Sequence, residues 1–408
     1  MSTQIYLDAI KEKLYGDSTV AKIWGVALPA LSEPKPRTEF PDYSKGNRYS
    51  TKDVDYWTSG FFPGSLYALL ERNDKFPDYF PSKKIHPVKL EFAARWWSHP
   101  LKSKSTKTDN HDIGFMIEPS FNKELAHSGD KEARDVLITA ANSLATRFDT
   151  KVGCIRSWDH FFETRPSSFE KDLIVIIDNM CNLNLLYRGA QLNNDLRLST
   201  IATTHAETTM KNHFREDWSS YHVVVYDRET GKAARKHTAQ GYSDESSWTR
   251  GQAWGILGYT ETYYFTKSQK FLDTAKRIVK YYLSHLPEDG VPPWDFHAPD
   301  KNIRDVSSGM VAAFGMLKIY EYTEEDEYLI NALKLVNDCT KLCFNKESKL
   351  DDDGTVDLGD TDTILNGSTF NNNPNAPEEY KIFDHGLVYA DYYFLMIGNK
   401  LLELGLYK

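Results

Sequence analysis

Two tryptophans and an arginine lie close together in one short segment, and these residue types could bind an acidic sugar. Trp248, Arg250 and Trp254 fall within seven residues, in an apolar run that continues through Leu257 and Tyr259. Indole rings offer flat faces on which sugar rings can stack, and the guanidinium group is a planar fork that matches a carboxylate. The segment therefore predicts a pocket for an acidic sugar.

Two aspartates are the candidates for acid and base chemistry. Asp112 follows His111 and opens the apolar segment 113–116, and Asp178 follows the apolar run 173–177. Taken singly, each aspartate is more simply explained as a helix N-cap that accepts backbone hydrogen bonds. Taken together, they would place two carboxylates at the N-terminal ends of two helices, and sugar hydrolysis by a pair of carboxylates requires such a pair.

Four other residues are candidates for the same pocket, and most of them have an ordinary structural explanation as well. His222 lies in an expected strand and could be half-buried there, Gln240 lies in a polar loop, and Trp57 could anchor the core. Trp158 lies in an expected loop, where packing explains a large aromatic side chain less easily.

The elements that must position these residues are mainly helices. Apolar periodicity, N-caps and helix breakers predict about twelve helical segments. Their approximate spans are 3–15, 60–72, 87–98, 112–128, 130–147, 178–192, 195–213, 245–266, 268–286, 306–322, 324–344 and 384–404.

The helices differ in their patterns, and the difference predicts two layers. Residues 309–317 and 386–390 are apolar on every side, whereas segments 268–286 and 324–344 are amphipathic. In the second half of the chain, the expected inner helices 245–266 and 306–322 are each followed by one of these amphipathic segments. This alternation predicts an all-α, (α/α)6 double-layered barrel, with a small β-hairpin insertion beginning at residues 221–231. No domain boundary is evident, so we expect one catalytic domain over residues 1–408.

Composition excludes several functional classes. The chain has 49 basic and 58 acidic residues and a net charge of −9, which disfavours a nucleic-acid partner. No apolar stretch is long enough to cross a bilayer and no signal peptide is evident, so we expect a cytoplasmic protein. Nucleotide-binding and metal-binding motifs are missing, which predicts no metal and no cofactor. The oligomeric state cannot be inferred from the sequence.

The chain resembles a known family, the unsaturated glucuronyl hydrolases of glycoside hydrolase family 88. The resemblance runs from about residue 55 to the C-terminus. Its motifs occur in the family's order: Trp57–Gly64, His111–Phe115, Ile177–Asn179, Tyr221–Val224, Gln240–Tyr242, Trp248–Trp254, Pro293–Phe296, Arg304–Asp305 and Gly386–Phe394. An (α/α)6 barrel is the family's fold.

The resemblance implies a role for each candidate. Asp178 would be the general acid and base, and Asp112 its essential partner. The residues expected around the sugar are Trp57, His111, Trp158, His222, Gln240, Trp248, Arg250 and Trp254. Residues 159–172 form an insertion relative to the family, and residues 1–50 and 371–373 match it poorly.

The reaction implied is hydration rather than ordinary glycoside hydrolysis. Polysaccharide lyases leave a C4=C5 double bond in the terminal uronic acid, and Asp178 would protonate C4 and then accept a proton from water adding at C5. We expect Arg250 and His222 to bind the uronate and polar ring oxygens. Burial and the Asp112 charge would raise the pKa of Asp178, which predicts a mildly acidic optimum with Asp112 ionised.

Three alternatives use the same fold. Hydrolases of unsaturated galacturonyl-rhamnose units tend to have Asn and Gly where this chain has Gln252 and Ala253, which favours glucuronyl substrates. A sugar epimerase would use histidine bases and would leave the ultraviolet absorbance of the double bond intact. A non-catalytic sugar-binding barrel would bind oligosaccharides without turnover.

Overall fold

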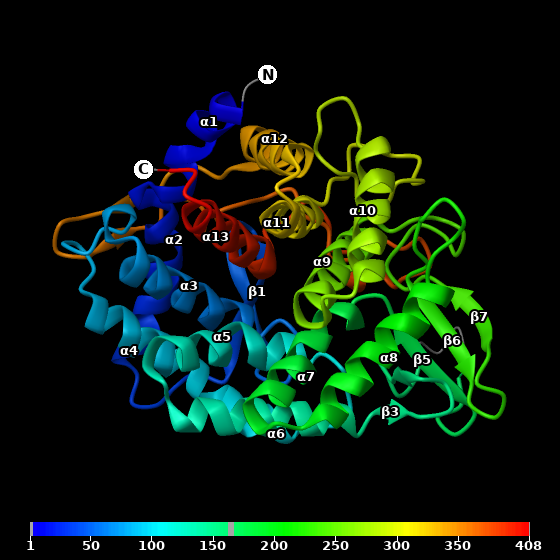
Figure 1. The fold of residues 1–408 in the computed structure, drawn as a ribbon. Helices are drawn as coiled ribbons and strands as arrows, with labels where there is room; N and C mark the ends of the chain where they lie inside the picture. The colour runs from blue at the N-terminus through cyan, green and yellow to red at the C-terminus, as the bar shows by residue number, and fades with distance from the viewer. Residues whose placement is uncertain (1–2, 162–166, 408) are drawn as a thin grey trace.

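A computed structural model describes residues 3–161 and 167–407, and its framework is a closed ring of helices (Figure 1). Six helices within these residues form the ring, each contacting the next and the last contacting the first. They are α3 (Phe61–Lys75), α5 (Ile113–Ser128), α7 (Asn179–Asn193), α9 (Thr249–Thr266), α11 (Val306–Thr323) and α13 (Val388–Glu403). This is the inner layer that the apolar segments predicted.

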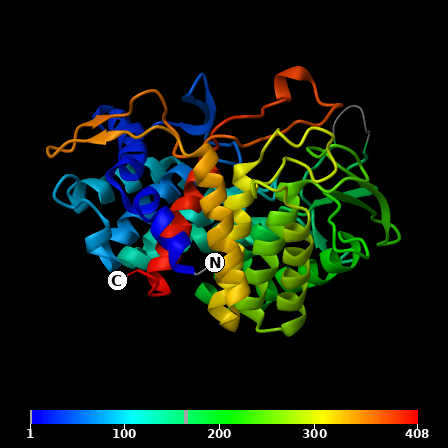
Figure 2. The same cartoon turned by 90° about the horizontal axis from the view of Figure 1, so that it is seen from above.

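An outer layer of amphipathic helices covers the ring (Figures 1 and 2). It consists of α4 (Pro87–Ser98), α6 (Lys131–Ala145), α8 (Leu196–Asn212), α10 (Gln269–Ser284) and α12 (Asp326–Cys343), with α1 (Thr3–Tyr15) and α2 (Asp17–Ala27) from the N-terminus. α1 packs against α12 and α13, so the N-terminal segment covers the C-terminal inner helix. The predicted double-layered helical barrel is confirmed.

All inner helices point the same way along the barrel. The residues at their N-termini meet one another at one end, while a cavity lined by residues further along all six helices lies toward the other end. An outer helix reverses the chain between successive inner helices. We therefore expect the partial positive charges of the inner N-termini to converge on a single end of the barrel.

Short strands lie beside that end of the barrel. β5 (Asp172–Ile176) pairs antiparallel with β6 (Val223–Asp227), and β6 pairs antiparallel with β7 (Ala233–His237). The hairpin of β6 and β7 confirms the predicted insertion, and β5 extends it into a larger sheet. Residues 162–166 of the expected insertion 159–172 lie outside the described residues.

Two further hairpins lie in segments for which the sequence predicted neither a helix nor a strand. One is formed by β1 (Glu39–Lys45) and β2 (Arg48–Asp53). The other, smaller hairpin pairs β8 (Lys349–Leu350) with β9 (Val356–Asp357). Gly46 and Asn47 both have positive φ at the first hairpin turn, which is the geometry of a tight two-residue connection.

Candidate active site

The two candidate carboxylates stand at the N-termini of neighbouring inner helices. Asp112 occupies the N-cap position of α5 and Asp178 that of α7, but neither side chain accepts a backbone hydrogen bond from its own helix. Both side chains are buried. The ordinary capping role therefore does not explain either residue. The carboxyl group of Asp112 instead contacts the side chains of Asn110 and Asn182.

A histidine faces each carboxylate. The Nε2 atom of His222 lies 3.5 Å from Oδ1 of Asp178, and Nε2 of His111 lies 3.2 Å from Oδ1 of Asp112. Oδ1 of Asp178 is buried and accepts no hydrogen bond from a described residue. This oxygen is therefore a buried acceptor that a reacting group could use, because an unpaired buried carboxylate oxygen carries a cost that a ligand could relieve.

Backbone contacts fix the tautomer of His222. Its Nδ1 atom accepts hydrogen bonds from the amides of Ala239 and Gln240, at 3.1 and 3.4 Å. A ring nitrogen that accepts carries no proton, so neutral His222 holds its proton on Nε2, the atom that faces Asp178.

Burial decides where the site holds its proton. Burial, followed by the charge of Asp178, raises the pKa of Asp112 to about 8. Burial lowers the pKa of His111 to about 3, so this histidine is neutral. Asp112 was expected to be ionised, and this expectation is wrong at neutral pH, because two buried carboxylates close together favour sharing one proton.

The sheet delivers three residues to the site. β5 ends two residues before Asp178, His222 immediately precedes β6, and Gln240 follows β7. The amide of Ile177 donates to the carbonyl of His222 at 3.0 Å, which ties the end of β5 to the start of β6. Trp158 forms a β-bridge with Ile174 on β5, and its ring lies 6.2 Å from that of His222.

Aromatic rings build the walls of the site. The ring of Trp248 lies 4.3 Å from that of His222, and Trp57 lies 5.1 Å from Tyr389 of α13. Trp254 is almost fully buried and packs 5.1 Å from Phe115 of α5. Trp57, Trp158 and Trp248 thus lie around the carboxylates, while Trp254 lies behind them as support.

Arg250 is held by the protein itself. Its Nη1 atom donates to Oδ2 of Asp305 at 2.5 Å and to the carbonyl of Thr369. Its Nη2 atom donates to Oε1 of Gln240 at 2.7 Å and to the carbonyl of Phe370 at 2.6 Å. Only Nε has no partner among the described residues. The guanidinium group of Arg250, which was expected to bind the uronate carboxylate, therefore already has protein partners for both of its Nη atoms.

These contacts give Arg250 a positioning function. Arginine has only donors, so the amide oxygen of Gln240 must face it and the amide NH₂ group points elsewhere. Asp305 is the N-cap of α11, and residues 369–370 precede α13, so one guanidinium links α9, α11 and the loop beside α13. Asp305 and Tyr389 were not identified as site residues from the sequence, although both occur in the family motifs.

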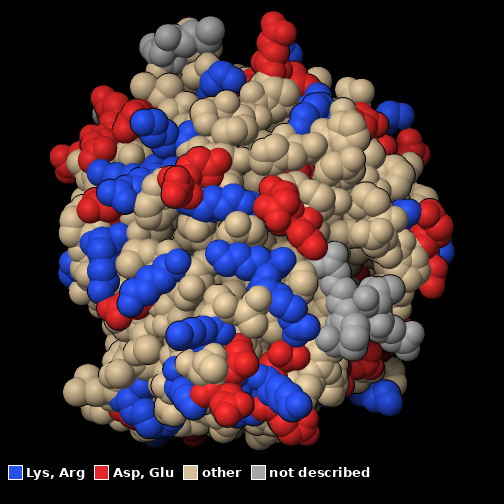
Figure 3. All heavy atoms as spheres, turned by 90° about the vertical axis from the view of Figure 1, so that its right-hand side faces the viewer, with Lys and Arg blue, Asp and Glu red and all other residues tan. Residues whose placement is uncertain are grey.

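Basic side chains gather on one face of the molecule, although the net charge of the chain is −9. Lys and Arg side chains gather across the middle of the face that carries β6 and β7 (Figure 3). Lys232 and Arg235 are exposed there. Among the described residues, no group of three or more His, Cys, Asp or Glu side chains could hold a metal ion, and no helix is long and apolar enough to cross a membrane.

Comparison with known proteins gives a consistent set of relatives. No protein-family model matches the chain. An unsaturated glucuronyl hydrolase of Formosa agariphila is 38% identical over 347 residues, which are 83% of this chain and 78% of that protein. An unsaturated chondroitin disaccharide hydrolase of Streptococcus pneumoniae is 34% identical over 282 residues, which are 68% of this chain and 67% of the relative.

A solved structure extends the similarity over nearly the whole chain. The crystal structure of an unsaturated glucuronyl hydrolase specific for heparin has a TM-score of 0.82 and 30% sequence identity. The alignment covers 98% of this chain and 99% of that chain. The ring of inner helices is therefore shared along its full length.

Proposed function

The chain belongs to the family of unsaturated glucuronyl hydrolases, and from this membership and its buried carboxylate pair we propose how it works. It is a glycoside hydrolase that releases 4,5-unsaturated glucuronic acid from the non-reducing end of oligosaccharides made by polysaccharide lyases. We propose that Asp178 transfers the proton and that Asp112 is its partner. The observation that carries this assignment is the unpartnered, buried Oδ1 atom of Asp178 beside Nε2 of His222.

The chemistry needs one proton to be given and one to be recovered. The single proton that the two carboxyl groups share must be on Asp178 when the reaction begins, which leaves Asp112 ionised at that moment. Protonation breaks the O–H bond of Asp178 and forms a C4–H bond with the π electrons, which leaves positive charge at C5 shared with the ring oxygen. Water then bonds to C5 and returns a proton to the carboxylate. The hemiketal opens to a ketone, and the C1 hemiacetal that this exposes releases the leaving sugar. The pair regains its proton in each cycle.

The same arrangement favours an anionic ring in the site. The N-termini of the inner helices converge there, and their amide groups favour negative charge. The proton shared by the two carboxyl groups removes one competing negative charge, and the Nε2–H of His222 and the NH₂ of Gln240 remain as donors. We propose that these donors, rather than the fork of Arg250, contact the uronate and ring oxygens.

Asp178→Asn tests the assignment directly. We expect kcat for a lyase-made disaccharide to fall by about 10²–10⁴-fold, the usual contribution of a general acid or base. The measurement is the loss of ultraviolet absorbance as the double bond is hydrated, together with product analysis. Full turnover by Asp178→Asn would overturn the assignment, and product that keeps its double bond would point to epimerisation.

The identity of the sugar next to the uronate is a separate question. Relatives carry names that specify chondroitin disaccharides and heparin, so we propose unsaturated glycosaminoglycan disaccharides as the substrate class. Lyase products of chondroitin, heparin, hyaluronan, gellan and pectin should be compared by kcat/KM. A preference for the pectin product would instead favour the galacturonyl alternative. A cytoplasmic location remains a prediction from the sequence.

A further inference from the structure

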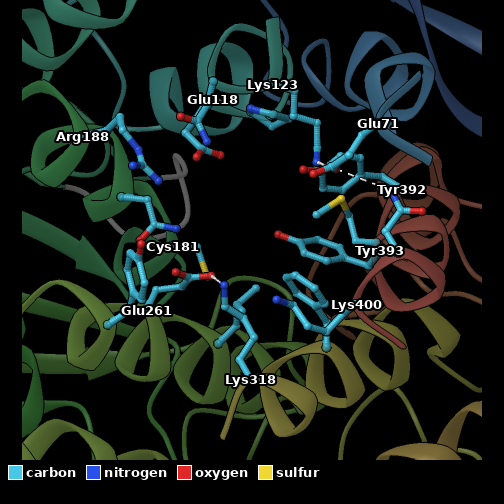
Figure 4. Close-up of a pocket in the computed structure, with 18 of the residues that line it drawn as sticks. Glu71, Glu118, Lys123, Cys181, Arg188, Glu261, Lys318, Tyr392, Tyr393 and Lys400 are labelled. Carbon is cyan, nitrogen blue, oxygen red and sulfur yellow. Dashed lines mark hydrogen bonds and ion pairs between the residues drawn. The ribbon is translucent and has the colours of Figure 1, made fainter. Parts of the chain in front are cut away.

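A cavity lies on the side of the ring away from the carboxylates. It has a volume of about 440 Å³ and is lined by residues of all six inner helices (Figure 4). We call it the end cavity. Its volume lies within the range of small-molecule binding sites in proteins. None of the candidate active-site residues lines it among the described residues.

The end cavity is separated from the active site by aromatic side chains. Phe115 and Tyr393 line the end cavity, and both pack against Trp254, at 5.1 and 5.8 Å. Phe115 also lies 5.7 Å from Trp57 on the other side. These aromatic side chains therefore lie between the end cavity and the candidate active site.

The charges that line the end cavity are balanced, and most of them are paired. Among the described residues, five acidic and five basic side chains line it. Glu71 is paired with Lys75 and Lys123, at 2.7 and 2.5 Å. The other ion pairs among the described residues of the lining are Lys75–Glu403 at 3.2 Å, Lys318–Glu261 at 2.7 Å, Lys400–Glu321 at 3.1 Å and Lys400–Glu403 at 2.7 Å.

Two charged groups of the lining form no close ion pair with a described residue, although they attract each other over a longer distance. Glu118 of α5 makes no hydrogen bond or ion pair with a described residue, and Arg188 of α7 makes no ion pair with one. The Nε atom of Arg188 and the Oδ1 atom of Asn184 are buried and lack partners in the described chain. Figure 4 shows Glu118 and Arg188 on the same side of the cavity, both directed into it.

This juxtaposition suits a polyhydroxyl ligand. A carboxylate only accepts hydrogen bonds and a guanidinium only donates them, so vicinal hydroxyls can satisfy both at once. Tyrosine and phenylalanine rings in the lining offer faces for a sugar ring, and the hydroxyl of Tyr393 points into the space. A ligand with net charge would bring uncompensated charge into a balanced, partly buried site.

We propose that the end cavity is a second, non-catalytic binding site for a neutral monosaccharide, held between Glu118 and Arg188. This goes beyond the proposed function, because the site lies on the far side of the aromatic wall from the carboxylates. The hydroxyls of the sugar donate to Glu118 and accept from Arg188, and its apolar face contacts the rings.

Calorimetric titration with four sugars tests the proposal. The probes are glucose and N-acetylglucosamine, which are neutral, glucosamine, which is cationic, and glucuronate, which is anionic. We expect the neutral sugars to bind the wild-type protein more tightly than the charged ones. Glu118→Gln and, separately, Arg188→Gln should each weaken that binding about tenfold, because a charge-assisted hydrogen bond is lost.

Matched variants locate the binding. Glu321→Gln removes a carboxyl group from the same lining that is already paired with Lys400, and we expect less than a twofold change. Trp57→Ala alters the active site and should also leave neutral-sugar binding within twofold. Thermal melting verifies that each variant is folded, and the two cavity variants are independent tests if one of them fails to fold.

Three results would overturn the proposal. Binding that survives in both cavity variants but is lost in Trp57→Ala would place the sugar in the active site. Equal or tighter binding of glucosamine or glucuronate would contradict a neutral ligand. If none of the four sugars binds, the end cavity is not the proposed binding site.

Discussion

The protonation of Asp112 is the residue-level feature with the widest consequences. Its side chain is buried at the start of α5, makes no capping hydrogen bond within its helix and lies near a second carboxylate. An aspartate on an exposed helix end would be ionised. Here the folded protein binds a proton that the unfolded chain releases near pH 4.

This difference makes stability depend on pH. The pKa of Asp112 is raised to about 8, so between about pH 4 and 8 the unfolded chain has lost the proton and the folded protein keeps it. The stability that this proton contributes is complete below pH 4 and is lost as the pH rises through 8. Asp112→Asn should therefore be more stable than wild type, by an amount that grows over this window to about 2–5 kcal/mol.

Denaturant unfolding at several pH values measures this effect. Asp352→Asn is the control, because that side chain is fully exposed. A difference between Asp112→Asn and wild type that stays constant from pH 4 to 9 would contradict the proton on Asp112.

The same proton predicts the alkaline limit of activity. Hydration needs a protonated pair, so kcat/KM should fall above about pH 8, where the pair loses its last proton. In Asp112→Asn, the fall of kcat/KM above about pH 8 should disappear. A kcat/KM profile with the same alkaline limb in both proteins would show that another group controls it.

At the scale of elements, the distance between α5 and α7 sets the separation of the two carboxylates. Gly114 of α5 faces Asn182 of α7, whose Oδ1 atom accepts a hydrogen bond from the amide of Phe115 at 2.8 Å. A Cβ atom on Gly114 would lie 2.3 Å from that oxygen and 2.8 Å from the Asn182 Cα. The contact is possible only because residue 114 lacks a side chain.

Gly114→Ala should therefore impair catalysis by moving one helix. We expect kcat to fall by about 10²-fold, because a displacement of about 1 Å at reacting groups can have that effect. Gly255→Ala in α9 is the control, since its Cβ would lie 3.4 Å from Ile278 Cδ1, and should change kcat by less than about threefold. Steady-state kinetics on folded variants decides, and equal effects of the two substitutions would refute a specific role for the α5–α7 contact.

At the scale of the whole molecule, the ring of helices is closed by the two ends of the chain. α13 contacts α3, and α1 covers the outside by packing against α12 and α13. The buried side chains of α1 are Tyr6, Leu7, Ile10 and Leu14. The N-terminal helix therefore supports the inner helix that carries Tyr389 into the site.

Ile10→Ala tests this closure. Ile10 is fully buried, and its truncation should lower the free energy of unfolding by about 2–5 kcal/mol. Ile5→Ala on the same helix is the matched control, because Ile5 is 54% exposed and should change stability by less than about 0.5 kcal/mol. Chemical denaturation followed by circular dichroism compares them, and similar losses from both would mean that α1 does not pack as described.

Much of this architecture could be predicted from the sequence. All twelve expected helical segments overlap helices of the structure, and segments 245–266 and 306–322 became inner helices, as expected. Apolar periodicity reports which faces of a helix are buried, and it needs no knowledge of the partner. The starts of α5 and α7, and with them the positions of Asp112 and Asp178, followed from the same signal, whereas α9 and α13 begin at Thr249 and Val388 rather than at the predicted residues 245 and 384.

The elements that the sequence did not predict are those with weak local sequence signals. α2 contains Gly25 and several β-branched residues, so its helix propensity is low and its buried residues, such as Trp24, stabilise it through tertiary contacts. The hairpin of β1 and β2 includes Pro41, which disfavours a strand, although Gly46 and Asn47 marked its turn.

The sequence by itself determined the elements and which residue types begin each inner helix, because these depend on short-range patterns. Tertiary structure alone decided how the polar groups are partnered. Arg250 meets Asp305 and Phe370 across 55 and 120 residues of sequence, and the proton on Asp112 depends on a carboxylate from another helix. Hydrogen bonds and charge depend on distances of a few ångströms, which only the packing of the helices sets.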